Sequence, residues 1–421
     1  MSSAANTLAI VSPAGDSGTG LAGSGAFEAV RHLRLPAYDP SSLEARLAAI
    51  DLARKAGAGW MVALGPQERL AGDALDLVAP GLELYDAIFG SAHVAGSTDA
   101  VSRLSRLAFD TADRLPHGLL NWWMPDAHFV RTDIAARVLR RVAGEYRNHW
   151  RLDYLYDLWG SARCMKSAQP LLELSAEPRS LDADGKAEIL RRLSDKPVFL
   201  PIIHGDDTYY LPYTGRNAGI EREQSRGLFF EALELEELRK IVKPGAHVVD
   251  VGANTGNHTV FFAGPMRAAS VIPFEPLPAA ADVLRATVER NGLRSVDLSR
   301  LLIGVSDRAG RAGLVFSERG GLGATGLQSD PQGDIVVATL DSMLSAPVEL
   351  LKIDVEGMEM QVLSGAEETI RRWRPMIFIE VANRNTSAFY SWLKASRYDV
   401  ARIFTDKGHA NYLLVPSGNS A

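Results

Sequence analysis

Three carboxylates that each follow an apolar run are the side chains of this sequence best suited to chemistry. Asp354 and Glu356 come after the run 350–353, and Glu380 follows the run 376–379. Because parallel strands end at one edge of a sheet, we expect the three side chains to share a crevice. A carboxylate there can accept the proton of an alcohol, and a second carboxylate raises its pKa towards neutrality. The same oxygens could instead bind a divalent cation, and the sequence leaves that choice open.

Two basic side chains stand behind these carboxylates as further catalytic candidates. Lys352 lies within the run before Asp354, and His258 opens the apolar segment after a glycine-bearing loop. Structural interpretations compete with both sets: His258 could cap or pack at a helix start, and Glu356 could be a helix N-terminal carboxylate favoured by the dipole. We assign no metal ligand from the sequence.

A strand, a glycine turn and a helix are predicted over residues 247–263. The turn carries Asp250, Gly252, Asn254 and Gly256. This arrangement presents backbone N–H groups to a ligand. The spacing differs from G-x-G-x-x-G, and the glycines allow close approach to an amino-acid tail and a ribose rather than to a pyrophosphate. A glycine-rich turn without a ligand is the alternative.

Glu275 ends the next predicted strand, residues 270–275, about one βα unit after Asp250. An acidic residue at that distance meets the ribose hydroxyls of a nucleotide in such folds. A carboxylate can accept two O–H bonds there, and charge-assisted bonds are the strong ones. The alternative is a solvent-exposed glutamate at a strand end.

These motifs resemble class I S-adenosylmethionine (SAM) methyltransferases, and among them the FkbM-type family. The resemblance covers residues 200–415 and is carried by VVDVGANTGNHTV, VIPFEP, LLIGVSD, LLKIDVEGMEMQVLSGA and PMIFIEV. It implies an α/β fold with a Rossmann-like, mostly parallel sheet and an antiparallel closing strand, and SAM as the cofactor. It also implies that Ser306 and Asp307, which end a third strand at 301–305, contact the adenine.

The resemblance further implies methyl transfer to a hydroxyl oxygen of a glycan, polyketide or related secondary metabolite. The fourth-strand motif lacks the Asn/Asp-Pro-Pro-aromatic loop of base-N-methylating enzymes and the nucleophilic cysteine of cytosine C5 enzymes. Its carboxylates suit an alcohol instead. The expected mechanism is direct in-line displacement, in which the protein supplies orientation and a base.

Composition limits the classes of protein that remain. The chain has 421 residues, enough for two domains, and a net charge of −6 that disfavours nucleic acid as the main partner. Its single cysteine, Cys164, excludes an intrachain disulfide and a cysteine-based zinc site. There is no basic n-region and no apolar run of roughly 18 residues, so we expect a soluble cytoplasmic protein whose oligomeric state is open.

Residues 1–178 are predicted to form a separate α/β domain. Helices are expected at 39–56 and 71–78, and strands at 59–65 and 85–90. A glycine motif at 18–23 matches G-x-G-x-x-G but lies too far from the preceding apolar run, which favours a loop. A linker at 179–199 and the methyltransferase domain at 200–421 follow. Within that domain, residues 222–240 are predicted to be helical, with Glu231 on a mostly solvated face.

This N-terminal region resembles a degenerate family 2 glycosyltransferase. Gly65-Pro-Gln-Glu68 stands where that family has an Asp-x-Asp metal motif, and Asp153 stands at the position of its catalytic acid. A single carboxylate, Glu68, is a poor substitute for a chelating pair. We therefore expect a substrate-recognition or scaffold module, and its kinship makes a sugar hydroxyl the expected acceptor.

Three rival functions remain open. A bifunctional glycosyltransferase–methyltransferase would turn over a nucleotide sugar with manganese. A non-catalytic SAM-binding scaffold would bind SAM without forming S-adenosylhomocysteine (SAH). An NAD-dependent oxidoreductase is opposed by the Gly-x-Asn-x-Gly spacing of the main loop.

Overall fold

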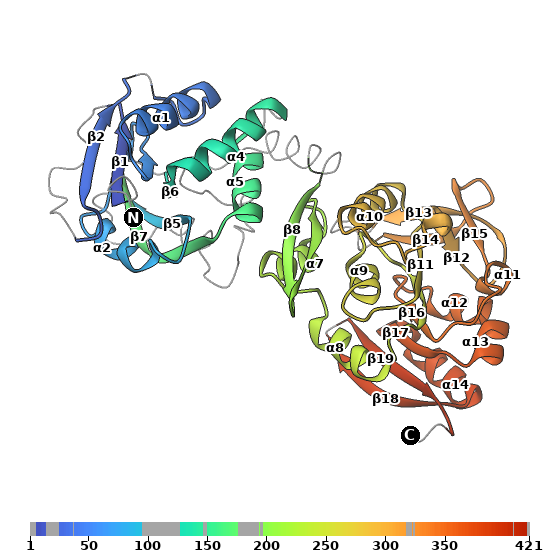
Figure 1. Cartoon of the computed structure of the whole chain (residues 1–421). Coiled ribbons are helices and arrows are strands. Elements are labelled where there is room, and N and C mark those ends of the chain that lie inside the picture. The colour runs from blue at the N-terminus through green and yellow to red at the C-terminus, as the bar shows by residue number, and fades with distance from the viewer. Residues whose placement is uncertain are drawn as a thin grey trace. The chain divides into compact units, whose positions relative to one another are not determined.

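A computed structural model divides the chain into two compact units, residues 1–200 and 201–421. Both are α/β structures (Figure 1). The residues described are 6–13, 25–36, 38–94, 127–145, 150–175, 193, 197–316, 322, 325–406 and 408–418. The glycine motif at 18–23 and most of the predicted linker lie outside them, and the predicted domain boundaries stay a prediction. Within these ranges no helix is long and apolar enough to cross a bilayer.

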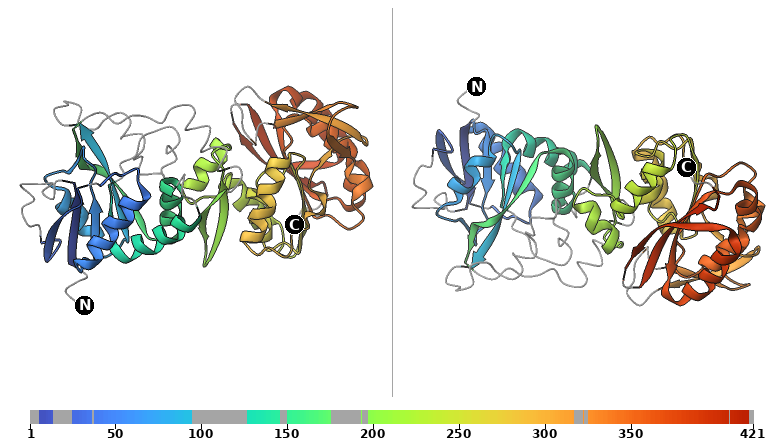
Figure 2. Two further views of the ribbon diagram at one scale, coloured as in Figure 1. Left: turned by 90° about the horizontal axis from the view of Figure 1, so that it is seen from above. Right: turned by 90° about the horizontal axis from the view of Figure 1, so that it is seen from below.

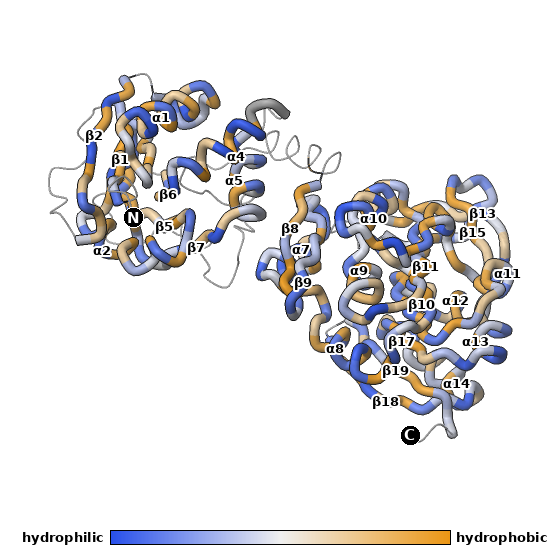
Figure 3. Tube along the Cα trace, in the orientation of Figure 1, coloured by the Kyte–Doolittle hydropathy of each residue, from blue (hydrophilic) through white to orange (hydrophobic). Residues whose placement is uncertain are grey.

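The described strands of the N-terminal unit form a mixed sheet of order β2-β1-β3-β6-β5-β7-β4. Its elements are β1 (Thr7–Ser12), β2 (Ala29–Arg34), α1 (Leu43–Lys55), β3 (Trp60–Ala63), β4 (Glu68–Leu70), α2 (Ala74–Val78), β5 (Ala87–Val94), β6 (Phe129–Arg131), α4 (Thr132–Glu145), α5 (Trp150–Ser161) and β7 (Cys164–Leu174). The predicted alternation of helices and strands is confirmed. Figure 3 shows hydrophobic and hydrophilic residues alternating along α1, as expected of an amphipathic helix.

The sequence singled out two acidic residues in this unit, Glu68 and Asp153, and the structure describes both. The Glu68 carboxylate accepts a hydrogen bond from the backbone N–H of Gly65 at 2.8 Å, which closes the turn before β4. Asp153 is buried within α5. The resemblance of this unit to glycosyltransferases stays a prediction.

The C-terminal unit is built on a sheet whose described strands follow the order β11-β10-β16-β17-β19-β18. Its elements are β8 (Val198–His204), β9 (Asp207–Tyr213), α7 (Ala218–Ser225), α8 (Ala232–Ile241), β10 (His247–Val251), α9 (Asn257–Ala263), β11 (Ser270–Phe274), α10 (Pro278–Arg290), β12 (Ile303–Val305), β13 (Gly310–Phe316), β14 (Thr325–Ser329), β15 (Ile335–Ala338), α11 (Leu340–Met343), β16 (Leu350–Ile353), α12 (Glu359–Gly365), α13 (Glu367–Trp373), β17 (Met376–Ala382), α14 (Thr386–Ser396), β18 (Tyr398–Thr405) and β19 (His409–Pro416). Strands β11, β10, β16 and β17 are parallel, whereas β19 is antiparallel to β17 and β18. The predicted mostly parallel sheet with an antiparallel closing pair is therefore confirmed.

Both faces of this sheet are covered by helices (Figures 1 and 2). Successive strand residues point to opposite faces. Val248 and Leu350 pack with side chains of α8 and α9. Val249 and Leu351 pack with α12, α13 and α14 on the other face. Even-numbered residues of β10 and β16 therefore face α8 and α9, which decides where the polar side chains of these strands point.

Two predicted elements differ in the structure. The prediction of a single helix over 222–240 is wrong. The structure has two separate helices, α7 and α8, because Gly227 and Glu231 between them both have left-handed backbone conformations. The strand predicted at 301–305 is shortened to β12, since Leu302 has a φ of 67°. That strand pairs in parallel with β15 in a second sheet rather than in the main ladder.

Candidate active site

The glycine loop between β10 and α9 lies close against the end of β16. Gly252 has a φ of +79°, and a Cβ on it would lie 1.7 Å from the backbone oxygen of Asp354. The backbone N–H groups of Gly252 and Ala253 both donate to Phe274 O at 3.0 Å. Gly256 has a φ of +99° and is the N-cap residue of α9. The loop thus needs glycine at both positions to follow this path.

Glu275 lies at the end of β11 and is 7% exposed. Its carboxylate accepts hydrogen bonds from the backbone N–H groups of Asn254 and Leu277, both at 2.8 Å. Burial raises the pKa of Glu275 to about 7, against the opposing effect of these two bonds. Each carboxylate oxygen keeps a lone pair for a further donor.

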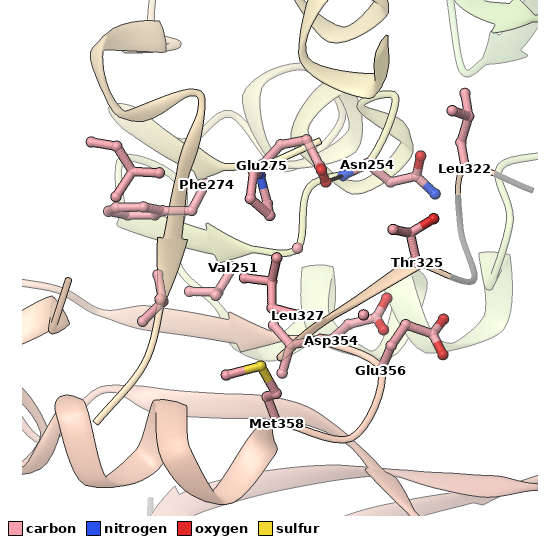
Figure 4. Close-up of a pocket in the computed structure, with 16 residues that line it drawn as sticks. Val251, Asn254, Phe274, Glu275, Leu322, Thr325, Leu327, Asp354, Glu356 and Met358 are labelled. Atoms are coloured by element: carbon pink, nitrogen blue, oxygen red, sulfur yellow. Dashed lines mark hydrogen bonds between the residues drawn. The ribbon is translucent and has the colours of Figure 1, made fainter. Parts of the chain in front are cut away.

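One pocket brings five of the predicted site residues together: Gly252, Asn254, Glu275, Asp354 and Glu356. Figure 4 shows Glu275 beside Asn254 on one side of this pocket and Asp354 near Glu356 on the other. Apolar side chains of β12 and β14, among them Ile303 and Leu327, complete its lining.

The loop that carries Glu356 is held in an unusual conformation. Glu356 and Gly357 have φ angles of 52° and 100°. The Glu359 carboxylate accepts a bond from Gly357 N at 2.7 Å, and Arg384 Nη2 donates to Glu356 O at 3.0 Å. Asn385 Nδ2 donates to Gly357 O at 2.9 Å and to Glu359. These contacts hold the backbone at Glu356 in place and thereby set the direction of its side chain. Burial first, and then the negative charges of Asp354 and Glu359, raise the pKa of Glu356 to about 7.

Lys352 is buried beneath the glycine loop and joins three parts of the site. Its Nζ lies 3.1 Å from Asp250 Oδ1 and 3.5 Å from Asp354 Oδ2, and donates to Gly252 O at 2.8 Å. Asp250 also accepts a bond from Thr259 Oγ1 at 2.6 Å. Burial acts to lower the pKa of Lys352, but the charges of Asp250 and Asp354 raise it overall. The lysine therefore stays protonated and ties the loop to β16.

His258 and Glu380 lie outside the lining of this pocket. His258 Nε2 is 2.9 Å from Glu231 Oε2, and Glu380 Oε2 is 3.2 Å from His409 Nε2. Burial raises the pKa of Glu380 to about 9, and the charges of Asp354 and Glu356 add to that effect.

Sequence reasoning missed Glu231, which was expected on a solvated helix face. Its side chain is only 13% exposed, and its Oε1 also accepts a bond from Asn411 Nδ2 at 2.7 Å. Burial acts to raise its pKa, but the bond with His258 leaves the pKa lowered overall. The interruption at Gly227 was the available signal that the acidic helix starts later.

Ser306 and Asp307 line a neighbouring cavity between β12 and β13. The two cavities share Leu327 and Met358 in their linings. The structure thus places this predicted pair in a cavity that adjoins the pocket of Gly252, Asn254 and Glu275.

Comparisons with known proteins show which proteins this chain resembles. The model of the methyltransferase FkbM domain matches residues 250–402. No curated protein sequence matches the chain. Among solved structures, an rRNA methylase from Streptococcus thermophilus is 14% identical over 44% of this chain and 96% of its own, with a TM-score of 0.30. A Streptococcus mutans protein assigned as a methyltransferase and solved with SAH is 13% identical over 44% and 96%, with a TM-score of 0.31.

The residues present fit the cofactor of such a domain. Gly252 lets the loop lie directly against the end of β16, and the buried Glu275 carboxylate beside it can accept hydrogen bonds from hydroxyl groups. Asp354 and Glu356 supply negative charge to the same pocket, which suits a sulfonium. The matched range 250–402 includes all four residues. Residues 250–402 thus match a methyltransferase FkbM domain, and the cofactor of this segment is SAM.

Proposed function

We propose that the C-terminal unit transfers the methyl group of SAM to a hydroxyl oxygen of its acceptor. The observation that supports this best is that Asp354 and Glu356 line the same pocket as the glycine loop and Glu275. When bound, SAM supplies an electrophilic methyl group on a sulfonium that leaves without protonation. What the chain must add is orientation and a group that takes the hydroxyl proton.

We assign the role of general base to Glu356. A base works best when its pKa lies near the working pH, and the pKa of Glu356 is about 7. Asp354 lies 3.5 Å from Lys352 Nζ, and its carboxylate is already engaged in that ion pair. Lys352 acts in this scheme by positioning the glycine loop, and His258 by filling the space beside Glu231.

The predicted cofactor residues divide into two roles. Gly252, Asn254 and Glu275 contact SAM directly, with Glu275 accepting from the ribose hydroxyls. Ser306 and Asp307 receive the adenine, which would reach their cavity past Leu327 and Met358. Asp250 and Gly256 hold the loop: the first through Lys352, the second through its φ of +99°.

The acceptor in this proposal is a glycan or a related secondary metabolite. The support is the resemblance of the N-terminal unit to glycosyltransferases, which makes it a recognition module for a sugar. The reaction itself needs only the C-terminal unit.

The test is a screen of hydroxylated glycosides and polyketides with the full chain and SAM. SAH formation and an added methyl group by mass spectrometry are the readouts. Glu356→Gln should lose turnover by about a hundredfold or more, as expected for a general base. Glu289→Gln, an exposed glutamate of α10, is the matched control and should retain it. SAM binding without SAH on any acceptor would refute the proposal in favour of a scaffold.

A further inference from the structure

Three side chains with metal-ligating atoms converge beside the cofactor pocket. Glu231, Glu380 and His409 each place one carboxylate oxygen or imidazole nitrogen within 4.8 Å of the other two. Glu231 immediately precedes α8, Glu380 lies in β17, and His409 begins β19. None of the three lines the pocket that contains Asp354 and Glu356.

The sheet register explains why they meet. Glu380 lies directly opposite Asn411 in the antiparallel pair of β17 and β19, and His409 is two residues from Asn411 on the same face. That face is the one covered by α8 and α9. Asn411 Nδ2 and His258 Nε2 hold the two oxygens of Glu231 at 2.7 and 2.9 Å. The loop before α8 is thereby fixed over the end of the sheet.

The three candidate ligands are two carboxylates and one imidazole, and all three side chains are partly exposed to solvent. The side chains of Glu231, Glu380 and His409 are 13%, 17% and 32% exposed. Two carboxylates with one imidazole suit a divalent ion of intermediate hardness such as Mn²⁺ or Zn²⁺. Ligands bound to one ion at about 2.1 Å lie roughly 3 to 4 Å apart. The ligating atoms of the three side chains would therefore have to approach one another only slightly to bind an ion.

The charge around the three residues also favours a bound cation. The negative charges of Asp354, Glu356 and Glu231 all act on Glu380. Lys352, the lysine that also acts there, is already paired with Asp250 and Asp354. A divalent ion would supply the positive charge that these carboxylates lack.

We propose that Glu231, Glu380 and His409 form a binding site for one divalent transition-metal ion at the acceptor side of the pocket. The remaining coordination positions would be filled by water and by the acceptor hydroxyl, which a bound cation makes more acidic. The proton would then pass to Glu356 as the oxygen attacks the methyl group and SAH leaves. This second role rests on the proposed methyl transfer, whereas the metal site itself does not.

The experiment is calorimetric titration of the untagged, chelator-treated full chain with MnCl₂ and with ZnSO₄. We expect one equivalent of either ion to bind with micromolar affinity. Glu380→Gln and His409→Gln should each weaken binding at least tenfold. The control is His204→Gln, because the His204–Glu236 pair has the same chemistry, a distance of 2.7 Å and a histidine exposure of 29%. It should bind as the wild type does.

Circular dichroism and SAM titration of each variant check that it folds, and Glu231→Gln provides an independent third variant. Absence of binding of both ions to the wild type overturns the site. So does wild-type affinity in correctly folded Glu380→Gln, His409→Gln and Glu231→Gln. Methyl transfer in a protein that binds neither ion refutes the metal site alone. Tight metal binding without methyl transfer to any acceptor refutes the proposed function alone.

Discussion

Gly252 is the position at which one added methyl group should damage the cofactor pocket most. The Cβ of Gly252→Ala would lie 1.7 Å from Asp354 O, whereas ordinary contact begins at 3.4 Å. The loop and the end of β16 would have to move apart by about the difference, roughly 1.7 Å, to relieve the overlap. Asp354 O belongs to the backbone, so no side-chain rotation can make this space.

Two hydrogen bonds oppose that movement. Asp354 N donates to Val251 O at 3.0 Å, and Lys352 Nζ donates to Gly252 O at 2.8 Å. Leaving such groups unpaired costs about 1–3 kcal/mol each. Alanine in the left-handed conformation adds roughly 1–2 kcal/mol. We therefore expect the unfolding free energy of the C-terminal unit to fall by about 3–8 kcal/mol, and SAM affinity to fall at least tenfold.

Gly245→Ala is the matched control, because its φ is +87° and nothing lies within 4 Å of the added Cβ. It should lose only the roughly 1–2 kcal/mol of backbone strain. Urea unfolding of the full chain, followed by hydrogen exchange in β10 and β16, measures both variants, and calorimetry measures SAM binding. Equal stability and wild-type SAM affinity in the two variants would refute the close approach of loop and strand.

Four further predictions address single side chains. The pKa of Glu275 is raised from 4.5 to about 7. The folded state therefore holds the extra proton between those values, and stability falls as pH rises through that window. Relative to Glu275→Gln, the wild type should lose about 3 kcal/mol of unfolding free energy between pH 4.5 and 7, and parallel pH profiles would contradict this. If Glu356 is the base, kcat/KM should rise with pH through about 7, and Glu356→Gln should abolish that rise. Asn385→Ala should lower kcat while leaving SAM affinity within about twofold, because it loosens the loop that carries Glu356 but not the residues that bind SAM. An unchanged kcat would show that the hydrogen bonds of Asn385 are not needed to position Glu356. Ser42→Ala should destabilise the N-terminal unit by about 1 kcal/mol in urea unfolding, since Ser42 accepts a bond from Ala45 N at the start of α1.

The part of the site that lies at strand ends could be predicted from the sequence. Glu275, Asp354 and Glu356 each follow a short apolar run, and parallel strands bring such ends to one edge of the sheet. This reasoning agrees with the structure for these three residues, whereas Glu380, expected in the same crevice, lies outside the lining of the pocket. Ser306 and Asp307 were expected near these three residues because of the family resemblance. It could not foresee that β12 pairs in a second sheet, because the left-handed Leu302 gives no periodic signal.

Residues whose roles depend on distant partners could not be predicted in this way. Glu231 belongs to an acidic stretch with helical spacing, which favours a solvated face. Its actual surroundings come from His258 and Asn411, which are 27 and 180 positions away. Lys352 did carry a usable signal. A lysine inside an apolar strand requires a buried acidic partner, and Asp250 is the acidic residue in the adjacent strand.

The central claim is that the pocket bounded by the glycine loop and Glu275 binds SAM. Calorimetric titration of the full chain with SAM, beside Glu275→Ala and with NAD and UDP-glucose as controls, tests it most directly. The account predicts micromolar SAM binding by the wild type, no comparable binding of NAD or UDP-glucose, and at least tenfold weaker SAM binding by the variant. That factor corresponds to the roughly 1.5–3 kcal/mol of a charged hydrogen-bond acceptor. Folded wild-type protein that binds no SAM, or a folded variant that binds SAM as tightly as the wild type, would contradict the account.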